Sequence, residues 1–386
     1  MKTTGLLFIS HSAELNGAER MLLSLLRHLD RRRFTPSLVL PEDGPLREEA
    51  EALHCATYTA PMKWSMTTRK NVWKQPLAAL WNRKAVNVIV KYALEHNCRL
   101  IYSNSAASFC GALAAKRLSL PHIWAIHEIL SGPNAHLVSL LKGKRVTGWM
   151  KDLSCAVITN SETTARAFAG QPNVHVIPNG FEFSDPDPRG AADFRKRTGA
   201  EENDFLLGIV GKLYPGKGQM EVVRVLPRLI EIIPRLKLVL IGGGEDSRYE
   251  KEIRRFRRKN GLEDSLILME YQTDLVSALH GLDSLVVPSK VESFGRVAVE
   301  AMAVRTPVLA LACGGLEEII EHGRTGFLLK DMKPETLTDV IRRVVEEQDF
   351  IQDVKKNASL YVRKHFSIEG HVTSVEQVIE TCRERN

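Results

Sequence analysis

Residues 284–302 have the sequence SLVVPSKVESFGRVAVEAM, which places a short apolar run before a segment typical of a helix start. The run Ser284–Val287 has the length and composition of a buried strand. Ser293 is of the residue type that caps helix N-termini, which predicts a helix that begins near Phe294. The backbone N–H groups of Phe294 to Arg296 would then point out of the helix start and form an anion site suited to a diphosphate.

The same alternation of apolar runs and helical patterns extends along the chain. Apolar residues recur at helical spacing from Ala18 to Leu29, and Glu250–Lys259 is predicted to be a charged, solvated helix. Strands that alternate with helices predict an α/β protein with parallel sheets covered on both faces. The predicted strands are Leu6–Ser10, Thr35–Leu40, Leu100–Ser103, Ile123–Ile126, Cys155–Thr159, Phe205–Val210, Leu236–Ile241, Leu266–Met269, Ser284–Val287 and Val308–Ala310.

A cluster of Pro, Gly and Asp divides the chain. Residues 177–180 (IPNG) are followed by residues 184–190 (SDPDPRG), where the apolar periodicity stops as in an interdomain linker. A length of 386 residues also favours two domains. We therefore predict an N-terminal domain of residues 1–180, a second domain of residues 181–360, and a C-terminal helix in residues 361–386.

The composition is that of an ordinary soluble globular protein, with 44% hydrophobic and 26% charged residues. The first apolar run, Leu6–Ile9, is too short for a membrane span or a secretory leader, and no other stretch is long enough to span. The six cysteines lack metal-ligand spacing and are expected to be reduced, buried thiols of a cytosolic protein. The net charge of +7 allows nucleic acid, an anionic membrane or a phosphorylated small molecule as partners.

Residues 208–218, GIVGKLYPGKG, follow a predicted strand and nearly match the nucleotide-binding P-loop. Gly218 stands where that motif has Ser or Thr, so the hydroxyl that binds Mg²⁺ is missing and a P-loop is disfavoured. What remains is a glycine-rich turn with Lys212 and Lys217, both able to reach a phosphate. Two solvated lysines in a loop are the alternative.

Two acids and one histidine complete the candidate site. Glu292 and Glu300 flank the predicted helix start and could accept hydrogen bonds from sugar hydroxyls, although ordinary surface acids have the same spacing. His127 precedes Glu128 at the carboxyl end of a predicted strand, where open α/β sheets bind ligands; a structural histidine is the alternative. Gly17 opens the first helix and could present backbone N–H groups to a ligand.

Together these motifs resemble the retaining glycosyltransferases of family 4, also called group 1, which have the GT-B fold. The resemblance rests on an E-x7-E pattern at 292–300 and on the motifs at 17–19, 127–128, 177–180, 210–218 and 314–326. It implies two Rossmann-like domains whose parallel sheets face a central cleft. The N-terminal domain would be the acceptor side and the second domain the nucleotide-sugar donor side. The last helix would pack back on the N-terminal domain.

The resemblance also implies a role for each site residue. Glu300 would bind the ribose hydroxyls, and Glu292 would face the donor sugar near the reacting carbon. Lys212 and Lys217 would clamp the diphosphate; the family commonly has Arg in place of Lys212, and Lys loses the bidentate geometry. His127 would touch the donor sugar and orient the reaction. The other donor contacts would come from Gly17, which lets the N-terminal loop approach the phosphates, and from backbone groups of Ser293, Phe294 and Gly295.

The implied reaction moves a sugar from a nucleoside-diphosphate sugar to an acceptor with retention of configuration. No cofactor and no metal are expected, because lysines and a helix N-terminus would stabilise the departing diphosphate. A nucleotide-sugar 2-epimerase and a catalytically silent binding protein of the same fold are alternatives. A nucleic-acid-binding module is disfavoured, since the sequence has no helix-turn-helix, zinc-finger or RNA-recognition signature.

Two acid-free stretches lie in the predicted N-terminal domain. Residues 52–94 contain no Asp or Glu, and their basic residues are interleaved with Trp64, Trp73 and Trp81. The second stretch runs over residues 129–151. Basic residues attract anionic headgroups and Trp favours the membrane interface, which predicts a cytoplasmic enzyme, peripheral on the inner face of a membrane, with a lipid-linked, polysaccharide or other anionic acceptor. A solvated basic face with the tryptophans in the core is the alternative.

Overall fold

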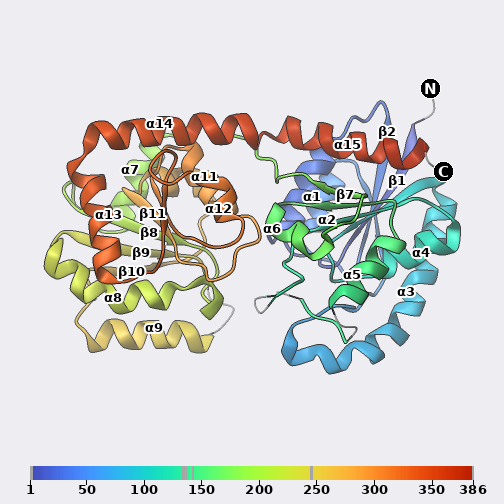
Figure 1. The fold of residues 1–386 in the computed structure, drawn as a ribbon, viewed down its shortest axis with the longest axis horizontal. Coiled ribbons are helices and arrows are strands. Elements are labelled where there is room, and N and C mark those ends of the chain that lie inside the picture. The colour runs from blue at the N-terminus through green and yellow to red at the C-terminus, as the bar shows by residue number, and fades with distance from the viewer. Residues whose placement is uncertain (1–2, 133–134, 136, 141–142, 244–246, 385–386) are drawn as a thin grey trace. The chain divides into compact units, whose positions relative to one another are not determined.

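The computed structural model describes residues 3–132, 135, 137–140, 143–243 and 247–384. The chain divides into two compact units: unit 1 comprises Met1–Phe181 and Phe366–Asn386, and unit 2 comprises Glu182–His365. Each unit is built on one parallel sheet with helices packed against it (Figure 1). The prediction of an α/β protein with two Rossmann-like domains is confirmed.

The described part of unit 1 contains a seven-stranded sheet with the order β3-β2-β1-β4-β5-β6-β7. The strands are β1 (Thr4–Ser10), β2 (Phe34–Leu40), β3 (Ala56–Thr59), β4 (Cys98–Asn104), β5 (His122–Ile126), β6 (Ala156–Thr159) and β7 (Val174–Val176). The order reverses between β1 and β4. In an open α/β sheet the carboxyl ends of the strands at such a reversal form the crevice that binds ligands.

Helices cover both faces of this sheet because successive residues of a strand point to opposite sides. Leu6 and Phe8 of β1 pack with α1, α2 and α15, whereas Leu7 and Ile9 pack with α3 and α4. The helical segments of unit 1 are α1 (Gly17–His28), α2 (Pro45–Ala52), η1 (Arg69–Lys74), α3 (Gln75–Glu95), α4 (Cys110–Leu118), α5 (Gly143–Asp152), α6 (Glu162–Ala165), η2 (Arg166–Phe168) and α15 (Ile368–Glu384).

The C-terminal helix α15 is a structural part of unit 1. Its residues Val375 and Ile379 lie in the same apolar cluster as Leu6 and Phe8. The carboxylate of Glu376 accepts a hydrogen bond of 2.8 Å from the backbone N–H of Asp30 and another of 2.8 Å from the guanidinium of Arg33. These hydrogen bonds fix the position of α15 along its axis relative to residues 30–33.

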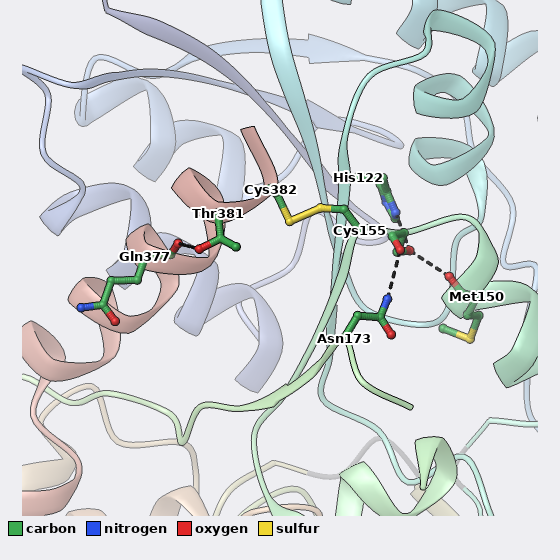
Figure 2. Close-up of a disulfide and its surroundings, with 8 residues drawn as sticks. His122, Met150, Cys155, Asn173, Gln377, Thr381 and Cys382 are labelled. Atoms are coloured by element: carbon green, nitrogen blue, oxygen red, sulfur yellow. Dashed lines mark hydrogen bonds between the residues drawn. A yellow bond between two sulfur atoms is a disulfide. The ribbon is translucent and has the colours of Figure 1, made fainter. Parts of the chain in front are cut away.

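A disulfide joins Cys382 of α15 to Cys155, the residue before β6 (Figure 2). The expectation that all six cysteines are reduced is therefore wrong for this pair. The remaining cysteines are free thiols. The pairing arises because α15 returns across the sheet at β4 and β5, which brings together cysteines 227 residues apart. Next to the bridge in sequence, the hydroxyl of Ser154 lies 2.9 Å from Nδ1 of His122.

The described part of unit 2 contains a six-stranded parallel sheet with the order β10-β9-β8-β11-β12-β13, which reverses between β8 and β11. The strands are β8 (Phe205–Val210), β9 (Leu236–Ile241), β10 (Leu266–Met269), β11 (Ser284–Val287), β12 (Val308–Leu311) and β13 (Phe327–Leu329). The helical segments are α7 (Pro188–Arg197), η3 (Pro215–Lys217), α8 (Gln219–Ile232), α9 (Ser247–Lys259), α10 (Leu275–His280), α11 (Arg296–Ala303), α12 (Leu316–Ile319), α13 (Pro334–Glu346) and α14 (Gln348–His365).

All ten predicted strands are present, but three further strands were not predicted. β3, β7 and β13 have only three or four residues, and β3 and β7 contain no buried residue, so they lack a distinctive apolar run. Helix α7 begins at Pro188, inside the predicted linker, because the side chain of Asp187 accepts hydrogen bonds from the N–H groups of Arg189 and Gly190. Helices long and apolar enough to traverse a bilayer are absent from the described part of the chain.

Replacing Cys155 and Cys382 together with Ser should lower the thermal stability of the protein in the absence of reductant, because the bridge restricts the unfolded chain. For a loop of this length the chain-entropy argument gives an upper figure of roughly 5 kcal/mol. Differential scanning calorimetry of the natural chain and the double variant measures the loss.

Reductant supplies the matched control. It should lower the melting temperature of the natural chain and leave that of the double variant unchanged. Thiol titration of the unfolded, unreduced natural chain should find the four free cysteines, Cys55, Cys98, Cys110 and Cys313. Titration of all six would contradict the pairing.

Candidate functional site

The carboxyl edge of the unit 2 sheet brings together loops that are far apart in sequence. β8 and β11 pair directly, with Leu207 opposite Ser284, so the loops that follow them leave the sheet side by side. The backbone N–H of Lys290 donates to the carbonyl of Gly216 at 3.2 Å and joins the two loops. The predicted phosphate turn and the predicted helix start thus form one structure.

The close approach of these two loops requires glycine at position 218. Its φ of 72° lies in the left-handed region, and a Cβ placed there would clash with the carbonyl oxygen of Pro288. A Ser or Thr could not occupy this position without displacing one of the loops. The P-loop interpretation therefore fails on steric grounds as well as on the missing hydroxyl.

Lys217 and Glu292 form an ion pair across the two loops. Lys217 Nζ lies 2.7 Å from Glu292 Oε2, and the two side chains are only 28% and 15% exposed. Burial by itself would lower the pKa of Lys217, but the charge of Glu292 and its hydrogen bond raise that pKa above its usual value. Lys217 therefore stays protonated at neutral pH and holds a positive charge at the carboxyl edge of the sheet.

A third loop, after β12, packs against Glu292 and its neighbours. The N–H of Gly315 donates to the carbonyl of Glu292 at 2.9 Å. A Cβ at Gly315 would lie 2.6 Å from the backbone of Ser293 and Phe294, so only glycine permits this approach. Cys313 donates to the carbonyl of Ser289 at 3.0 Å, and burial raises the pKa of its thiol to about 11. The backbone of residues 289–294 is thereby fixed from both sides.

The start of α11 differs from the prediction. The helix begins at Arg296 and its N-cap is Gly295, so Ser293 is not the cap. Gly295 has a φ of 109°, which keeps the chain out of the helix until the next residue. The first-turn N–H groups of a helix lack intrahelical acceptors. The anion site that we expect at this helix therefore begins at Gly295 and Arg296 instead of Phe294.

Glu300 lies one turn into α11, where it pairs with Arg296. Arg296 Nη2 donates to Glu300 Oε1 at 3.1 Å, and each side chain is 26% exposed. Lys212 follows β8 and is exposed at the same edge, and its carbonyl accepts a hydrogen bond of 2.9 Å from the buried Gln219. The structure brings Lys217 and Glu292 into contact. Lys212 lies on the same loop as Lys217, and Glu300 lies in the helix that follows the loop of Glu292.

In unit 1 the predicted site residue His127 follows β5 and belongs to a polar cluster. Its Nε2 lies 2.8 Å from Oδ1 of Asn104, the last residue of β4. Asn104 in turn donates to the carbonyl of Ala18 at 3.0 Å. Glu128 accepts hydrogen bonds from the hydroxyl of Ser105 and from the N–H of Ala106. His127 is therefore held by β4, the neighbouring strand of β5 that borders the sheet reversal.

Glu19 and His11 form the other half of this cluster. His11 Nδ1 lies 3.4 Å from Glu19 Oε1 and 3.3 Å from the carbonyl oxygen of Asn104. Glu19 is almost fully buried, and burial raises its pKa although the nearby His11 acts in the opposite direction. Gly17 is exposed as the first residue of α1, two residues before Glu19.

Sequence reasoning missed His11, Asn104 and Arg296. His11 and Asn104 could have been found as polar residues at the ends of predicted strands, as His127 was. Arg296 stands four residues before Glu300, a spacing that favours a helical ion pair. Among the described residues, no group of three or more His, Cys, Asp and Glu side chains is arranged to hold a metal ion.

Comparison with known families matches both units. Residues 15–184 match the family described as Glycosyltransferase Family 4, and residues 191–361 match Glycosyl transferases group 1. A D-inositol 3-phosphate glycosyltransferase of Stackebrandtia nassauensis is 30% identical over 236 residues, which cover 56% of this chain and 53% of that protein. This chain therefore spans little more than half the length of that relative.

Two further similarities come from a curated protein and a solved structure. The glycogen synthase of Mycobacterium tuberculosis is 28% identical over 279 residues, which cover 68% of this chain and 64% of that protein. The structure of Anabaena HepE in complex with UDP and glucose superimposes with a TM-score of 0.81 at 25% identity and covers 98% of this chain and 100% of that one.

Glu19→Gln should stabilise the protein at neutral pH relative to the natural chain. A carboxyl whose pKa is raised by folding supports the folded state fully below its unfolded pKa and loses that support as pH rises through its folded value. The unfolding free energies of the two proteins should therefore diverge as pH rises from 4 towards neutrality. Denaturant unfolding at a series of pH values measures the divergence.

The exposed neighbour Glu14 provides the control. Glu14→Gln should follow the natural chain at every pH. A constant offset between Glu19→Gln and the natural chain across the whole pH range would show that Glu19 acts through packing instead of ionisation.

Proposed function

Because this chain belongs to the group 1 glycosyltransferases of family 4, we propose that it transfers a sugar from a nucleoside-diphosphate sugar to an acceptor. The observation that carries the proposal is the Lys217–Glu292 pair on two interlocked loops at the carboxyl edge of the unit 2 sheet. That edge is where sheets of this topology bind nucleotides. The complex of Anabaena HepE with UDP and glucose supports this donor class.

The donor diphosphate would bind where the loop cations meet the α11 N-terminus. Lys217 carries a positive charge that Glu292 maintains, and Lys212 lies on the same turn. When the bond between the sugar and the phosphate breaks, negative charge accumulates on the diphosphate. Fixed cations and the helix N-terminus stabilise that charge, so the proposed reaction requires no cofactor and no metal.

The two acids would divide the donor between them. Glu300 would bind the ribose hydroxyls, while Glu292 would lie against the sugar near its reacting carbon. Backbone groups of Ser293, Phe294 and Gly295 would contact the sugar and phosphates, and the packing of Gly315 on this segment supports a fixed position for them.

Unit 1 would supply the remaining contacts. His127 would touch the donor sugar and orient it, since Asn104 holds the ring nitrogen at 2.8 Å. Gly17 would admit a phosphate close to the backbone at the start of α1. Both residues lie at the carboxyl edge of the unit 1 sheet, by the β1–β4 reversal.

The chemistry would follow a front-face course. The bond from the anomeric carbon to the phosphate oxygen breaks, and the acceptor oxygen forms its bond on the same face. The acceptor proton moves to the departing phosphate oxygen, so no protein base is needed and the configuration is retained.

The acceptor would be anionic or lipid-linked, such as a precursor of a cell-envelope polysaccharide. The D-inositol 3-phosphate glycosyltransferase relative supports a phosphorylated acceptor. The enzyme would act in the cytoplasm, peripheral on the inner face of the membrane. Reductants there remove accessible disulfides; in the Cys155–Cys382 bridge Cys382 is 2% exposed and Cys155 is partly buried, so the bridge would persist only as far as this burial shields it.

Replacing Lys217 with Gln or Glu300 with Ala should weaken donor binding without unfolding the protein. A lost charge-assisted hydrogen bond costs about 1.5–3 kcal/mol, or roughly ten- to a hundredfold in affinity. Thermal-shift titrations with UDP-, GDP- and ADP-glucose identify the donor and measure the loss, because ligand bound to the folded state raises its stability.

Matched controls exist within unit 2. Lys237 is also a partly buried, ion-paired lysine, but it lies in β9 near the amino end of that strand, and Glu250 forms the same i, i+4 pair with Arg254 that Glu300 forms with Arg296. Lys237→Gln and Glu250→Ala should bind donor like the natural chain. His127→Ala should lower turnover more than donor affinity. Equal losses in site and control variants would exclude the proposed donor site.

The product should keep the anomeric configuration of the donor. NMR spectra of the glycoside formed from the identified donor, with D-inositol 3-phosphate as a first acceptor to try, report the new linkage through its anomeric coupling constant. Retention is expected because donor and acceptor react on one face. An inverted linkage would refute the proposed mechanism, and a free 2-epimer of the donor would establish the epimerase alternative.

A further inference from the structure

Helix α3 exposes large apolar side chains along one side. Trp73, which precedes the helix in η1, is 70% exposed, and Leu77, Leu80 and Trp81 are 61%, 58% and 53% exposed. The spacing of these residues places them on a single helical stripe. We call these four residues the α3 stripe. The tryptophans at 73 and 81 are therefore not core residues, which removes the alternative left open by the sequence for this segment.

The opposite side of α3 is buried and carries both apolar and polar residues. Ala85, Val86, Ile89 and Ala93 pack in the apolar cluster with strands β1 and β4. Asn82 is 4% exposed and exchanges hydrogen bonds of 2.8 and 2.9 Å with the backbone of Lys63. Gln75 is 8% exposed and bonds the backbone of Val138 and Leu140, each at 2.8 Å. These hydrogen bonds fix the first half of the helix with Leu77, Leu80 and Trp81 outward, while Val86 and Ile89 of its second half are buried.

The segment that carries the α3 stripe is basic, and its last basic residue, Lys91, pairs with Glu95 at the end of α3 at 3.7 Å. Residues 52–94 contain no acidic side chain, so no carboxylate of this segment offsets its basic residues. The ammonium of Lys74 lies 5.3 Å from the centre of the Trp73 ring. The exposed basic residues of the segment are Lys63, Arg69, Lys70, Lys74, Arg83, Lys84 and Lys91.

We propose that the α3 stripe and its basic surround dock unit 1 on an anionic lipid bilayer. Trp and Leu on one side of a helix enter the boundary between headgroups and acyl chains, and Lys and Arg beside them pair with anionic headgroups. A protein partner would match the apolar stripe equally well. The Trp residues at an acid-free basic surface favour the lipid interface, where tryptophan is enriched.

The docking surface is tied to the candidate site of unit 1. The loop clamped by Asn82 carries Trp64, whose ring centre lies 5.4 Å from that of His11. Ser65, in the same loop, donates its backbone N–H to the carbonyl of Ala107, after β4. A bilayer at the α3 stripe would therefore lie on the helix that holds this loop, and the loop adjoins the cluster of His11, Asn104 and His127. The inference rests on the proposed function in one respect only: docking would bring the enzyme to a lipid-linked or headgroup acceptor.

Flotation of the full chain with vesicles tests the proposal. Binding is expected to vesicles of phosphatidylcholine with phosphatidylglycerol at low ionic strength, and much less to phosphatidylcholine alone. The double variant Trp73→Ser/Trp81→Ser, and a variant with Gln at Arg69, Lys70, Lys74, Arg83 and Lys84, should each bind about tenfold more weakly or worse. Brominated acyl chains should quench the tryptophan fluorescence of the natural chain and not that of the double variant.

Helix α9 offers a matched charge control. Gln at Arg248, Lys251, Arg255, Arg258 and Lys259 removes five exposed basic residues from a helix with no exposed large apolar residue among those described. That variant should bind vesicles within about twofold of the natural chain, since it keeps the α3 stripe. Leu360→Ser, at an exposed leucine of α14, is the corresponding apolar control.

Three outcomes would overturn the proposal. The natural chain fails to float with anionic vesicles, or both α3 variants float like the natural chain. In the third outcome the natural chain does not float, but light scattering shows a dimer, and the variant Trp73→Ser/Trp81→Ser is monomeric. A second copy of this chain would then be what covers the α3 stripe. Donor thermal shifts, run on all variants, keep the two proposals separate: they should not change with the α3 stripe, and their absence in the natural chain would count against the proposed function alone.

Discussion

The direct pairing of β8 with β11 is the constraint on which the candidate site of unit 2 depends. Parallel neighbours at a sheet reversal send their following loops past one another at the same edge. Contact between these loops leaves no room for a side chain at Gly218 and brings Lys217 against Glu292. Charge and shape at this edge thus follow from strand order, and a residue change at Gly218 would disturb an ion pair that it does not touch.

The ion pair has a physical cost as well as a use. Burial disfavours the charged form of Lys217, and the protein offsets this with Glu292 instead of with solvent. A bound diphosphate would compete with Glu292 for the same ammonium. If Lys217 and Glu292 have the proposed roles, Glu292 would lie against both the lysine that binds the diphosphate and the sugar, and it would respond to the charge that develops on the leaving group. This coupling is a stronger reason to regard Glu292 as functional than its spacing from Glu300.

Local patterns were sufficient for the fold but only partly for the site. Strands with long apolar runs and the glycine-rich turn were predictable because their signals lie within a few neighbouring residues. The prediction that Ser293 caps α11 was wrong, because Gly295 adopts a left-handed φ that residue spacing does not reveal. The Lys217–Glu292 pair spans 75 positions and the Cys155–Cys382 bridge spans 227. Such contacts depend on the order of the strands, which no single segment specifies.

The orientation of α3 shows how buried polar groups can determine what a surface exposes. A rotation that buried Trp81 would also satisfy the hydrophobic effect, and it would withdraw Asn82 from its hydrogen bonds with Lys63. A buried amide without partners costs about 1–3 kcal/mol, and Gln75 adds a second such constraint at the start of the helix. Ala85, Val86 and Ile89 already fill the inner face of the helix, where side chains are close-packed. The hydrogen bonds of Asn82 and Gln75 therefore favour an orientation of α3 in which Trp73 and Trp81 are exposed, and this is the surface that the proposed bilayer would cover.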